Sequence, residues 1–499
     1  MNITANDWMA ILPALLTTGA AMGILCLELA FRSERVRSKL DWAAYAGLAG
    51  AFYVVLTSLG VPQEAFSKSI VKDDLSSFVS IAVLAAAALA ILQAPTYVVQ
   101  RGVYRAEFYA LVLLAATGMI FLAQANELIT MFLSVELLSL SIYVLTGITR
   151  RDRRSNEAAI KYFVQGAFAT GFLLYGMALL HGATGTVHLA DIAARLEHMP
   201  SFPPLAVAGV ALLIAGFAFK VGAAPFHYWV PDVYEGAPTV VTSFMSVAVK
   251  AAGIGALARI VLGALGSGSE AWGDLLFVVA ILTMVAGNLA AIGQRSVKRM
   301  LAYSGVAHTG YALVGLASVS AATTHDARAG ASSALFYVFV YTFMTLGAFA
   351  FLAWIGRPPS ASKPHGEDAE DISDFAGLAR RRPAAAAMMT VFMVSLAGVP
   401  PTAGFLGKFL LFKTAVDNQQ WWLAGIGILT SIVSLYYYLR VVVFMYMHES
   451  EAGEGAAPAS GDFNIGLAVG LCAFLTVLFG VRPGDYLVLA ESAIRGLLR

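Results

Sequence analysis

The sequence has only two cysteines and no nucleotide-binding motif, and each shortage excludes a class of chemistry. Cys26 and Cys472 both lie inside apolar stretches. Two isolated thiols cannot supply the several ligands that an iron–sulfur cluster or a zinc site requires. Neither G-x-G-x-x-G after an expected strand nor G-x-x-x-x-G-K-[ST] occurs. We therefore expect no metal and no cofactor in this chain, and any electrons or nucleotides to be handled by other proteins.

Charge is also scarce. Only 13% of the 499 residues are charged, 59% are hydrophobic, and the mean hydropathy is +0.74. Soluble domains carry about 25% charged residues. The net charge is +1 and no basic block is interleaved with aromatic residues, so the sequence predicts no nucleic-acid partner. Its expected environment is the lipid bilayer.

Long apolar stretches recur along the whole chain. A bilayer core of about 30 Å is crossed by a helix of roughly 20 apolar residues. The sequence therefore predicts an all-α polytopic membrane protein with about fourteen transmembrane helices. The predicted spans are 8–31, 41–60, 75–94, 106–124, 127–149, 156–180, 204–230, 239–263, 274–293, 300–320, 331–355, 384–415, 421–446 and 463–481.

The basic residues between the spans predict an orientation. If loop 32–40 is cytoplasmic, the cytoplasmic loops hold 20 Lys and Arg residues and the opposite side holds 7. By the positive-inside rule, both termini are then expected on the outer, periplasmic side. The one sizeable extramembrane segment is the cytoplasmic loop 356–383, in which DISDFAGLARRR suggests a short amphipathic surface helix.

Four charged residues lie deep inside apolar spans. Glu136, Lys220, Lys250 and Lys408 occur in FLSVELLSL, LIAGFAFKVGAAP, SFMSVAVKAAG and TAGFLGKFLLF. An ionisable group at bilayer depth costs about 2.5 kcal/mol or more, and such groups mark ion paths and proton relays. One acid and three lysines therefore predict a proton relay. The structural alternative is that Glu136 and Lys220 form one permanent pair.

Two of the lysines lie in interrupted spans. Lys220 precedes Pro225 by five residues, and Lys408 follows GVPPTAG. Proline opens a helix, and broken membrane helices mark ion sites. Two such spans in the two halves of the chain suggest an internal repeat, although the lysine precedes the proline in one and follows it in the other.

Two further side chains are candidates for linking the halves of a relay. Ser246 and Ser243 lie one and two turns before Lys250, which fits either a hydrated path or helix-to-helix hydrogen bonding. His308, in LAYSGVAHTGYALVG, fits a proton wire, and a hydrogen bond to a neighbouring helix explains it equally well.

Beyond these properties, three long segments resemble a known family. KVGAAPFHYWVPDVYEGAPTVVTSFMSVAVKAAG (220–253), KRMLAYSGVAHTGYALVG (298–315) and AGVPPTAGFLGKFLLF (397–412) resemble the antiporter-like membrane subunits of respiratory complex I. These subunits are similar to those of Mrp-type cation/proton antiporters. Among them the chain looks most like the N type of NADH:quinone oxidoreductase. It has about fourteen spans without a long lateral C-terminal helix, Lys408 in span 12, and DISDFAGLARRRP before that span.

The resemblance implies an architecture. It implies two inverted five-helix repeats with broken helices 7 and 12. The N-terminal helices 1–3 would occupy 1–105, the repeats 106–265 and 266–447, and the last helix with its tail 448–499.

The resemblance also implies a function, that of a non-redox subunit of a proton-translocating NADH:quinone oxidoreductase. Other subunits would handle NADH and quinone. Glu136 would tune Lys220, Lys220 would be loaded from one side, Lys250 would pass charge laterally, and Lys408 would hand it outward. The alanine-rich composition is typical of a bacterial protein, so the expected location is the inner membrane.

Three other functions fit parts of the pattern. The first is a subunit of a Mrp-type antiporter with no redox partner. The second is a secondary solute carrier, which would need a pocket of convergent polar groups that the sequence does not show. The third is a purely structural membrane arm in which the buried charges only pair.

Overall fold

The computed structural model describes residues 4–31, 33–103, 105–199, 202–265, 269–321, 324–356, 367–449 and 462–497. The described chain is almost entirely helical. Its first half contains α1 (Ala5–Ala30), α2 (Glu34–Arg37), α3 (Leu40–Thr57), β1 (Gln63–Ala65), β2 (Ile70–Lys72), α4 (Asp74–Gln100), α5 (Arg105–Gln124), α6 (Leu128–Thr146), α7 (Arg153–Thr184), α8 (Leu189–Glu197), α9 (Pro204–Val221), α10 (Trp229–Gly236), α11 (Thr239–Arg259) and the π-helix η1 (Ile260–Ala264). Strands β1 and β2 form one short antiparallel hairpin, with Glu64 opposite Val71.

The second half continues with helices of similar length. It contains α12 (Ser269–Ile292), α13 (Val297–Ala317), the 3-10 helix η3 (Ser318–Ala321), α14 (Thr324–Trp354), the 3-10 helix η4 (Ile372–Phe375), α15 (Leu378–Arg381), α16 (Pro383–Ala397), α17 (Ala403–Asp417), α18 (Trp421–Met447), α19 (Phe463–Val481) and α20 (Gly484–Arg495).

The long helices correspond to the predicted spans. Among the described residues, twelve helices are long and apolar enough to cross a membrane by length and composition. They coincide with twelve of the predicted spans. Of the other two, 300–320 falls on α13, and 384–415 falls on α16 and α17, each 15 residues long. The all-α multi-span architecture is confirmed, and the count of fourteen crossings stays a prediction.

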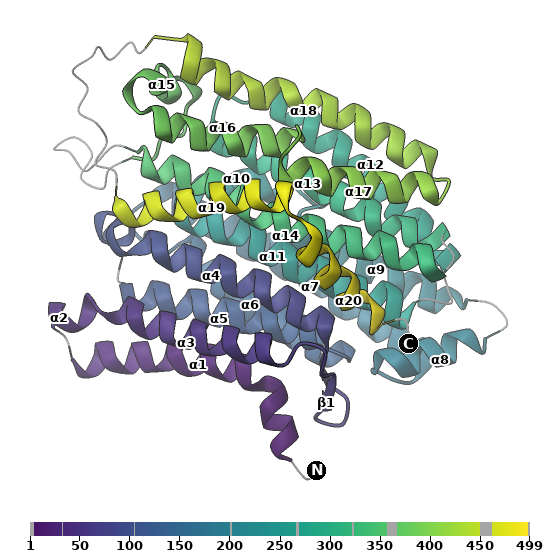
Figure 1. The fold of residues 1–499 in the computed structure, drawn as a ribbon. Coiled ribbons are helices and arrows are strands. Elements are labelled where there is room, and N and C mark those ends of the chain that lie inside the picture. Colours follow the sequence, from purple (N-terminus) through teal and green to yellow (C-terminus); the bar gives the residue numbers. More distant parts are fainter. Residues whose placement is uncertain are drawn as a thin grey trace.

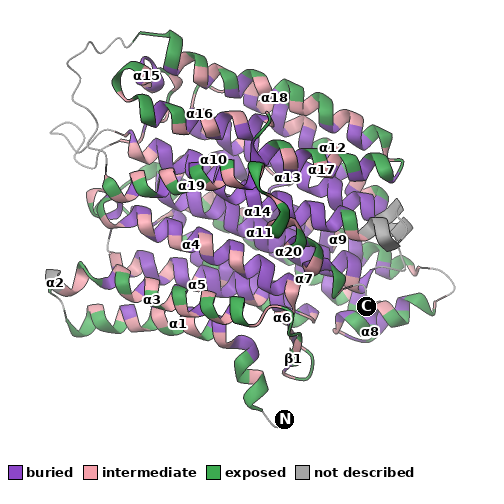
Figure 2. Cartoon of the chain, viewed as in Figure 1, coloured by how far each residue is buried: buried purple, intermediate pink, exposed green. Residues whose placement is uncertain are grey.

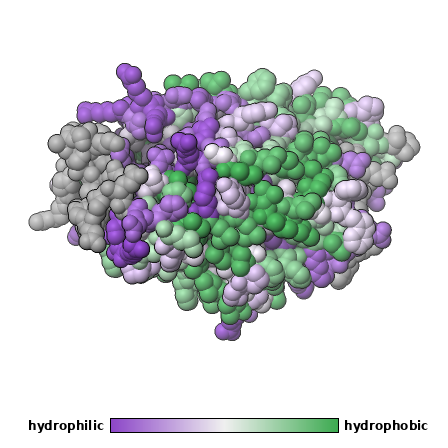
Figure 3. Space-filling view, turned by 90° about the horizontal axis from the view of Figure 1, so that it is seen from above, coloured by the Kyte–Doolittle hydropathy of each residue, from purple (hydrophilic) through white to green (hydrophobic). Residues whose placement is uncertain are grey.

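The helices lie side by side in one bundle (Figure 1). α1 and α3 form one edge and α18 the opposite edge. Both termini lie at the same end of the bundle, together with β1 and α8, whereas α2 and α15 lie at the other end. An even number of crossings produces this arrangement. Figure 3 shows a broad hydrophobic area between hydrophilic side chains that gather toward the two ends, as a membrane-embedded surface requires.

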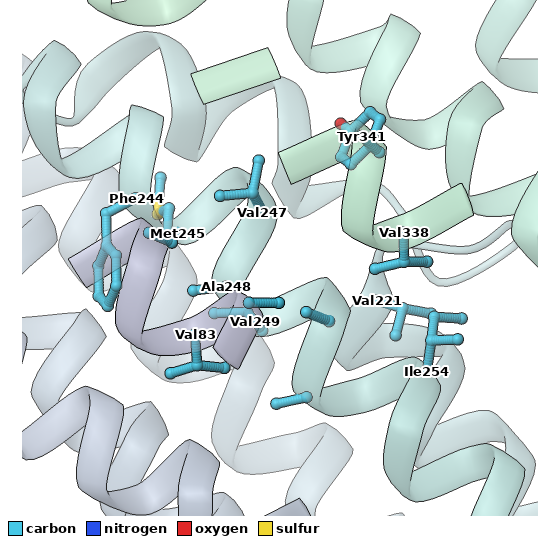
Figure 4. Packing of buried hydrophobic residues seen from close by; sticks show 14 of the residues in the cluster. Val83, Val221, Phe244, Met245, Val247, Ala248, Val249, Ile254, Val338 and Tyr341 are labelled. Atoms are coloured by element: carbon cyan, nitrogen blue, oxygen red, sulfur yellow. The ribbon is translucent and has the colours of Figure 1, made fainter. Parts of the chain in front are cut away.

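The centre of the bundle is the most buried part. Every residue of α11 is buried, and Figure 2 shows buried residues concentrated in the central helices and exposed ones along α1, α3 and α18. In Figure 4, Val83 of α4 lies near Val249 of α11, and Val221 of α9 and Val338 of α14 lie beside Ile254 of α11. Lys250 therefore lies on the helix that is most enclosed by the protein.

Both interruptions predicted from proline are present. α9 ends at Val221 and α16 ends at Ala397, and each is followed by a glycine with positive φ, +74° at Gly222 and +87° at Gly398. Only glycine adopts this left-handed conformation at no steric cost, so it is the usual residue just after a helix end. The inverted repeat and the proposed segment boundaries stay predictions.

The loop that the sequence analysis expects on the cytoplasmic side differs from its expected form. Of the predicted loop 356–383, residues 357–366 lie outside the described part of the chain. The predicted amphipathic helix in DISDFAGLARRR is wrong, because Gly377 at φ +66° separates η4 from α15. Phe375 and Leu378 are buried, so these two short helical segments are packed against the bundle.

Candidate functional site

Lys220 lies in the last turn of α9, directly before the break. Its side chain is buried, with 4% exposure. The ammonium Nζ donates to Ser139 Oγ at 2.6 Å and to Tyr143 OH at 3.2 Å, both on α6. It also lies 5.5 Å from the centre of the Tyr143 ring. A cation near the C-terminal end of a helix is stabilised by the helix dipole.

Glu136 lies on the same face of α6 as these two hydroxyls but does not contact Lys220 directly. Within the described part of the chain, the two side chains form no ion pair, and the hydroxyls of Ser139 and Tyr143 are the groups that hold the ammonium. Glu136 is half-buried and interacts electrostatically with Lys220 across this gap. The two residues therefore form no contact pair among the described residues, and the tuning of Lys220 by Glu136 stays a prediction.

Tyr143 is positioned by tight packing. Its ring meets Tyr162 edge to face, with ring centres 4.7 Å apart, and Tyr162 stacks on Trp229 at 4.3 Å. The indole N–H of Trp229 donates to the Phe219 carbonyl at 3.0 Å, one residue before Lys220. A Cβ atom on Gly166 would lie 1.9 Å from the Tyr143 oxygen, so only glycine leaves room for that hydroxyl.

Lys250 and the end of α9 are linked through α13. Lys250 Nζ donates to Thr309 Oγ1 at 2.9 Å and to the Gly305 carbonyl. The Thr309 hydroxyl in turn donates to the carbonyl of Val221 at 2.8 Å, the residue after Lys220. Lys250 is thus connected, through the Thr309 hydroxyl, to the backbone residue that follows Lys220.

A small cavity separates Lys250 from His308. Its lining includes Lys250, His308, Thr309, Tyr337 and Tyr341. Its volume is about 10 Å³, which is close to the lower limit for one water molecule. The surface of the cavity is mostly apolar, with Ile254, Ala312 and Val338 beside the polar side chains, so the cavity brings Lys250 and His308 to one small space without a direct hydrogen bond between them.

His308 is bonded on both ring nitrogens. Nδ1 lies 2.5 Å from the Tyr337 hydroxyl on α14, and Nε2 lies 3.0 Å from the Tyr438 hydroxyl on α18. Tyr438 is also hydrogen-bonded to Ser304, one turn before His308. The Tyr311 ring packs edge-on against His308 with centres 5.6 Å apart. The histidine is thus fixed between three helices and faces aromatic hydroxyls.

Lys408 lies beyond this aromatic group. Its side chain is 3% exposed, and Nζ donates to the carbonyls of Leu396 at 2.9 Å and Ala397 at 3.1 Å and to Ser431 Oγ at 3.0 Å. The same nitrogen lies 4.8 Å above the centre of the Tyr311 ring. Tyr311 therefore contacts both His308 and Lys408.

The two interrupted helices hold their lysines in different ways, because the Lys220 ammonium bonds hydroxyls of α6 whereas the Lys408 ammonium bonds carbonyls of α16 and Ser431. Lys220 sits on the last turn before Gly222, whereas Lys408 lies ten residues after Gly398 and its side chain turns back to the final carbonyls of α16. The Lys408 ammonium is therefore at the C-terminal end of a half-helix, and Lys220 belongs to the last turn of one. Such ends carry unsatisfied carbonyls and favour cations.

Several residues of this site were not predicted from the sequence. Thr309, Tyr311, Tyr337 and Tyr438 are buried beside the charged groups. The sequence does contain part of this pattern. Ser304, His308 and Tyr311 are spaced i, i+4 and i+7, so their side chains share one face of a helix. The partners on α14 and α18 come from other helices and leave no local pattern.

The described residues contain no group of three or more His, Cys, Asp or Glu side chains arranged to hold a metal ion. The ionisable side chains at the centre are lysines and one histidine, and their partners are hydroxyl and carbonyl groups. Such groups donate, accept and relocate protons.

Comparison with known proteins shows the family to which the chain belongs. The family described as NADH:quinone oxidoreductase/Mrp antiporter, TM, matches residues 125–434. A protein named NADH-quinone oxidoreductase subunit N from Trichlorobacter lovleyi is 43% identical, and the match covers 97% of this chain and 96% of that protein. The chain belongs to this family of antiporter-like membrane subunits.

Two solved structures share the fold. One chain of respiratory complex I from Thermus thermophilus with bound aureothin is 33% identical, with a TM-score of 0.78 and coverage of 96% of this chain and 99% of that one. A chain of the Mrp complex from Dietzia has a TM-score of 0.82, covers 98% of both chains and is 21% identical. The second likeness shows the fold alone. The match to the N subunits therefore carries the functional assignment.

Proposed function

We propose that this chain is the N-type, proton-translocating membrane subunit of a bacterial NADH:quinone oxidoreductase. It works beside other membrane subunits of that complex, and it contributes no redox centre. NADH and quinone react in partner subunits, and this chain moves protons in response. The observation that carries the proposal is the row of buried groups Lys220, Lys250, His308 and Lys408. Thr309 bonds Lys250 and the backbone carbonyl next to Lys220, Lys250 and His308 line one small cavity, and the Tyr311 ring contacts both His308 and Lys408.

The chemistry follows from the surroundings of the lysines. A lysine that is held by hydroxyls and carbonyls, with no carboxylate in contact, can exist with or without its proton, because no fixed negative charge holds the proton in place. Glu136 acts on Lys220 from a distance. A change of charge or position near Glu136, caused by quinone reduction in partner subunits, would alter the proton affinity of Lys220.

The order of transfer follows the order of contacts. A proton loaded at Lys220 passes to Lys250, which shares the α9 break through Thr309. It crosses the water-sized cavity to His308 and the tyrosine hydroxyls, and it reaches Lys408 beside Tyr311. Release to the outer side follows from Lys408.

The test compares Lys220→Arg with Lys220→Ala in the assembled complex. Arginine keeps the charge but stays protonated, since its pKa lies above about 12. If Lys220 carries a proton, both variants lower the number of protons moved per quinone reduced in membrane vesicles, while assembly largely survives. Lys413→Arg is the matched control, because Lys413 is exposed and pairs with Asp417 at the surface.

Two outcomes would contradict the relay. Near-normal pumping with Lys220→Arg would leave a structural role as the better account. Glu136→Gln should lower pumping and Glu136→Asp should be milder, so an unaffected Glu136→Gln would remove the tuning role.

The alternative is a subunit of a Mrp-type cation/proton antiporter, which the shared fold permits. Purification of the native assembly distinguishes the two, because only the first predicts co-purification with quinone-reducing subunits.

A further inference from the structure

The helix that carries Lys250 is fastened to α4 at both of its ends. α4 and α11 run in opposite directions, so the C-terminal end of α4 meets the start of α11, and the N-terminal end of α4 meets its end. Between these two points Ser243 Oγ donates to Gln93 Oε1 at 3.2 Å. Lys250 therefore lies between two fixed ends.

The first attachment is built around a buried carboxylate, Asp368. It follows α14 in the cytoplasmic loop, and its side chain is 7% exposed. Asp368 accepts from Arg101 Nη2 at 2.6 Å, from Tyr97 OH at 2.8 Å and from Thr239 Oγ1 at 2.6 Å. The Tyr97 oxygen also accepts from the Thr239 backbone N–H at 2.9 Å. One carboxylate thus joins α4, the loop and the first residue of α11.

The charge at this attachment is retained at neutral pH. Burial alone would raise the pKa of Asp368, but Arg101 and Lys298, with hydrogen bonds from Thr239 and Tyr97, outweigh it and hold the pKa below its ordinary value. Lys298 is itself buried and donates to the Ala237 carbonyl at 2.9 Å, two residues before Thr239. The start of α11 is therefore surrounded by paired charges.

The second attachment lies at the other end. The guanidinium of Arg259, the last residue of α11, pairs with both oxygens of Asp73 at 2.8 Å. Asp73 also caps the start of α4 by accepting from the Ser76 N–H at 2.9 Å. Arg259 additionally donates to the Ala123 carbonyl at 2.8 Å. Arg259 is 1% exposed, so this second attachment is enclosed by the protein.

Fixing both ends determines where the Lys250 side chain points. A shift of one residue along a helix moves a side chain by about 1.5 Å along the axis and about 100° around it. The contacts of Lys250 with Gly305 and Thr309 lie within hydrogen-bond distance and survive only a small displacement. Functional groups need support to within about 0.5 Å.

We propose that Asp368 is a positioning residue for Lys250, which acts through Thr239 to hold α11 against α4, with Arg259 and Asp73 fixing the opposite end. The inference rests on the proposed function, since it assigns a purpose to the exact placement of a relay lysine. Asp368 itself moves no proton along the relay.

The experiment uses the complete complex in membrane vesicles, with pumping measured as protons moved per quinone reduced and normalised to assembled complex. Thr239→Val removes the hydroxyl that bonds Asp368 but keeps the side-chain shape, and Thr239→Ser keeps the hydroxyl. We expect at least a threefold loss of protons per quinone for Thr239→Val and recovery to near the parent value for Thr239→Ser. Recovery with serine assigns the loss to the hydroxyl, because serine restores the hydroxyl and lacks the methyl group that valine keeps. Asp368→Asn is expected to lower pumping as well, and Asp417→Asn, at an exposed pair, serves as its control.

Two results distinguish this inference from the function on which it rests. If Lys250→Met loses pumping while Thr239→Val pumps as the parent does, the positioning role is wrong and the relay stands. If Lys250→Met itself pumps normally, the relay is wrong. Should Asp368→Asn fail to assemble, the Thr239 pair still decides the question.

Discussion

Lys250 and Thr309 form the closest connection between the two halves of the charged row. The Lys250 ammonium donates to the Thr309 hydroxyl over 2.9 Å, and that hydroxyl donates to the Val221 carbonyl over 2.8 Å. Neither residue lies in an interrupted helix. The Thr309 hydroxyl therefore connects the end of α9, beside Lys220, to the lysine of α11.

Thr309→Val should lower proton pumping. Valine keeps the shape and removes both hydrogen bonds. A hydrogen bond to a charged group stabilises it by about 1.5–3 kcal/mol, so a loss of roughly tenfold in pumping rate is expected. Thr342→Val is the control, because the Thr342 hydroxyl is buried on α14 and donates to the Val338 carbonyl of its own helix. The measurement is the initial rate of acidification in vesicles. Equal rates in the two variants would show that the hydroxyl of Thr309 has no special role.

The orientation of the chain is a separate prediction. With 20 basic residues on one side and 7 on the other, both termini should face the periplasm. The bundle places the two termini at one end, opposite α2 and α15 (Figure 1). Reporter fusions at each terminus test the side, and activity typical of the cytoplasm at both ends would reverse the assignment.

The purified chain should carry no redox centre. Its two cysteines cannot coordinate a cluster together, since Cys26 is exposed on α1 and Cys472 is buried on α19. We expect no flavin or iron–sulfur absorbance in the isolated subunit after detergent extraction. A chromophore that stays bound through purification would contradict the division of labour between this chain and its partners.

Composition and single residues predicted the membrane architecture and the two broken helices well. The local signals were strong, because a charged residue in an apolar span and a proline after glycine are visible without any knowledge of neighbours. The residue pairs that form the site could not be predicted from the sequence. Lys250 and Thr309 are 59 residues apart, and Arg259 and Asp73 are 186 apart, so their contacts depend on how helices pack.

The direction in which a long side chain points could not be predicted from the sequence either. The sequence placed Lys408 after its proline, and nothing local indicated that its ammonium turns back to the carbonyls of Leu396 and Ala397. The ammonium of a lysine sits on a flexible four-carbon stem, so the position of the charge depends on which hydrogen-bond acceptors are within reach. The pairing of Glu136 with Lys220 failed as a contact for the same reason, because Ser139 and Tyr143 lie nearer to the ammonium.

Two glycines of α7 should respond in opposite ways to the same substitution. At Gly166 an added Cβ would lie 1.9 Å from the Tyr143 hydroxyl, whereas at Gly171, five residues later, nothing lies within 4 Å. Gly166→Ala should therefore displace Tyr143 and weaken its contact with Lys220. A displacement of about 1 Å can lower a rate by up to about 100-fold, so we expect a clear loss of pumping.

Gly171→Ala makes the same chemical change without the clash. Alanine favours a helix by about 1 kcal/mol over glycine, so this variant should keep full pumping and equal or greater thermal stability. Combining Gly166→Ala with Tyr143→Leu provides the decisive comparison, because leucine removes both the hydroxyl and the ring carbon Cζ, which would lie 1.9 Å and 2.6 Å from the Cβ of an alanine at 166. If the clash with the Tyr143 side chain is the cause, Gly166→Ala should lose thermal stability in the parent but much less in the Tyr143→Leu background. Equal destabilisation in both backgrounds would show that Gly166 serves helix packing and not the placement of the Tyr143 hydroxyl at Lys220.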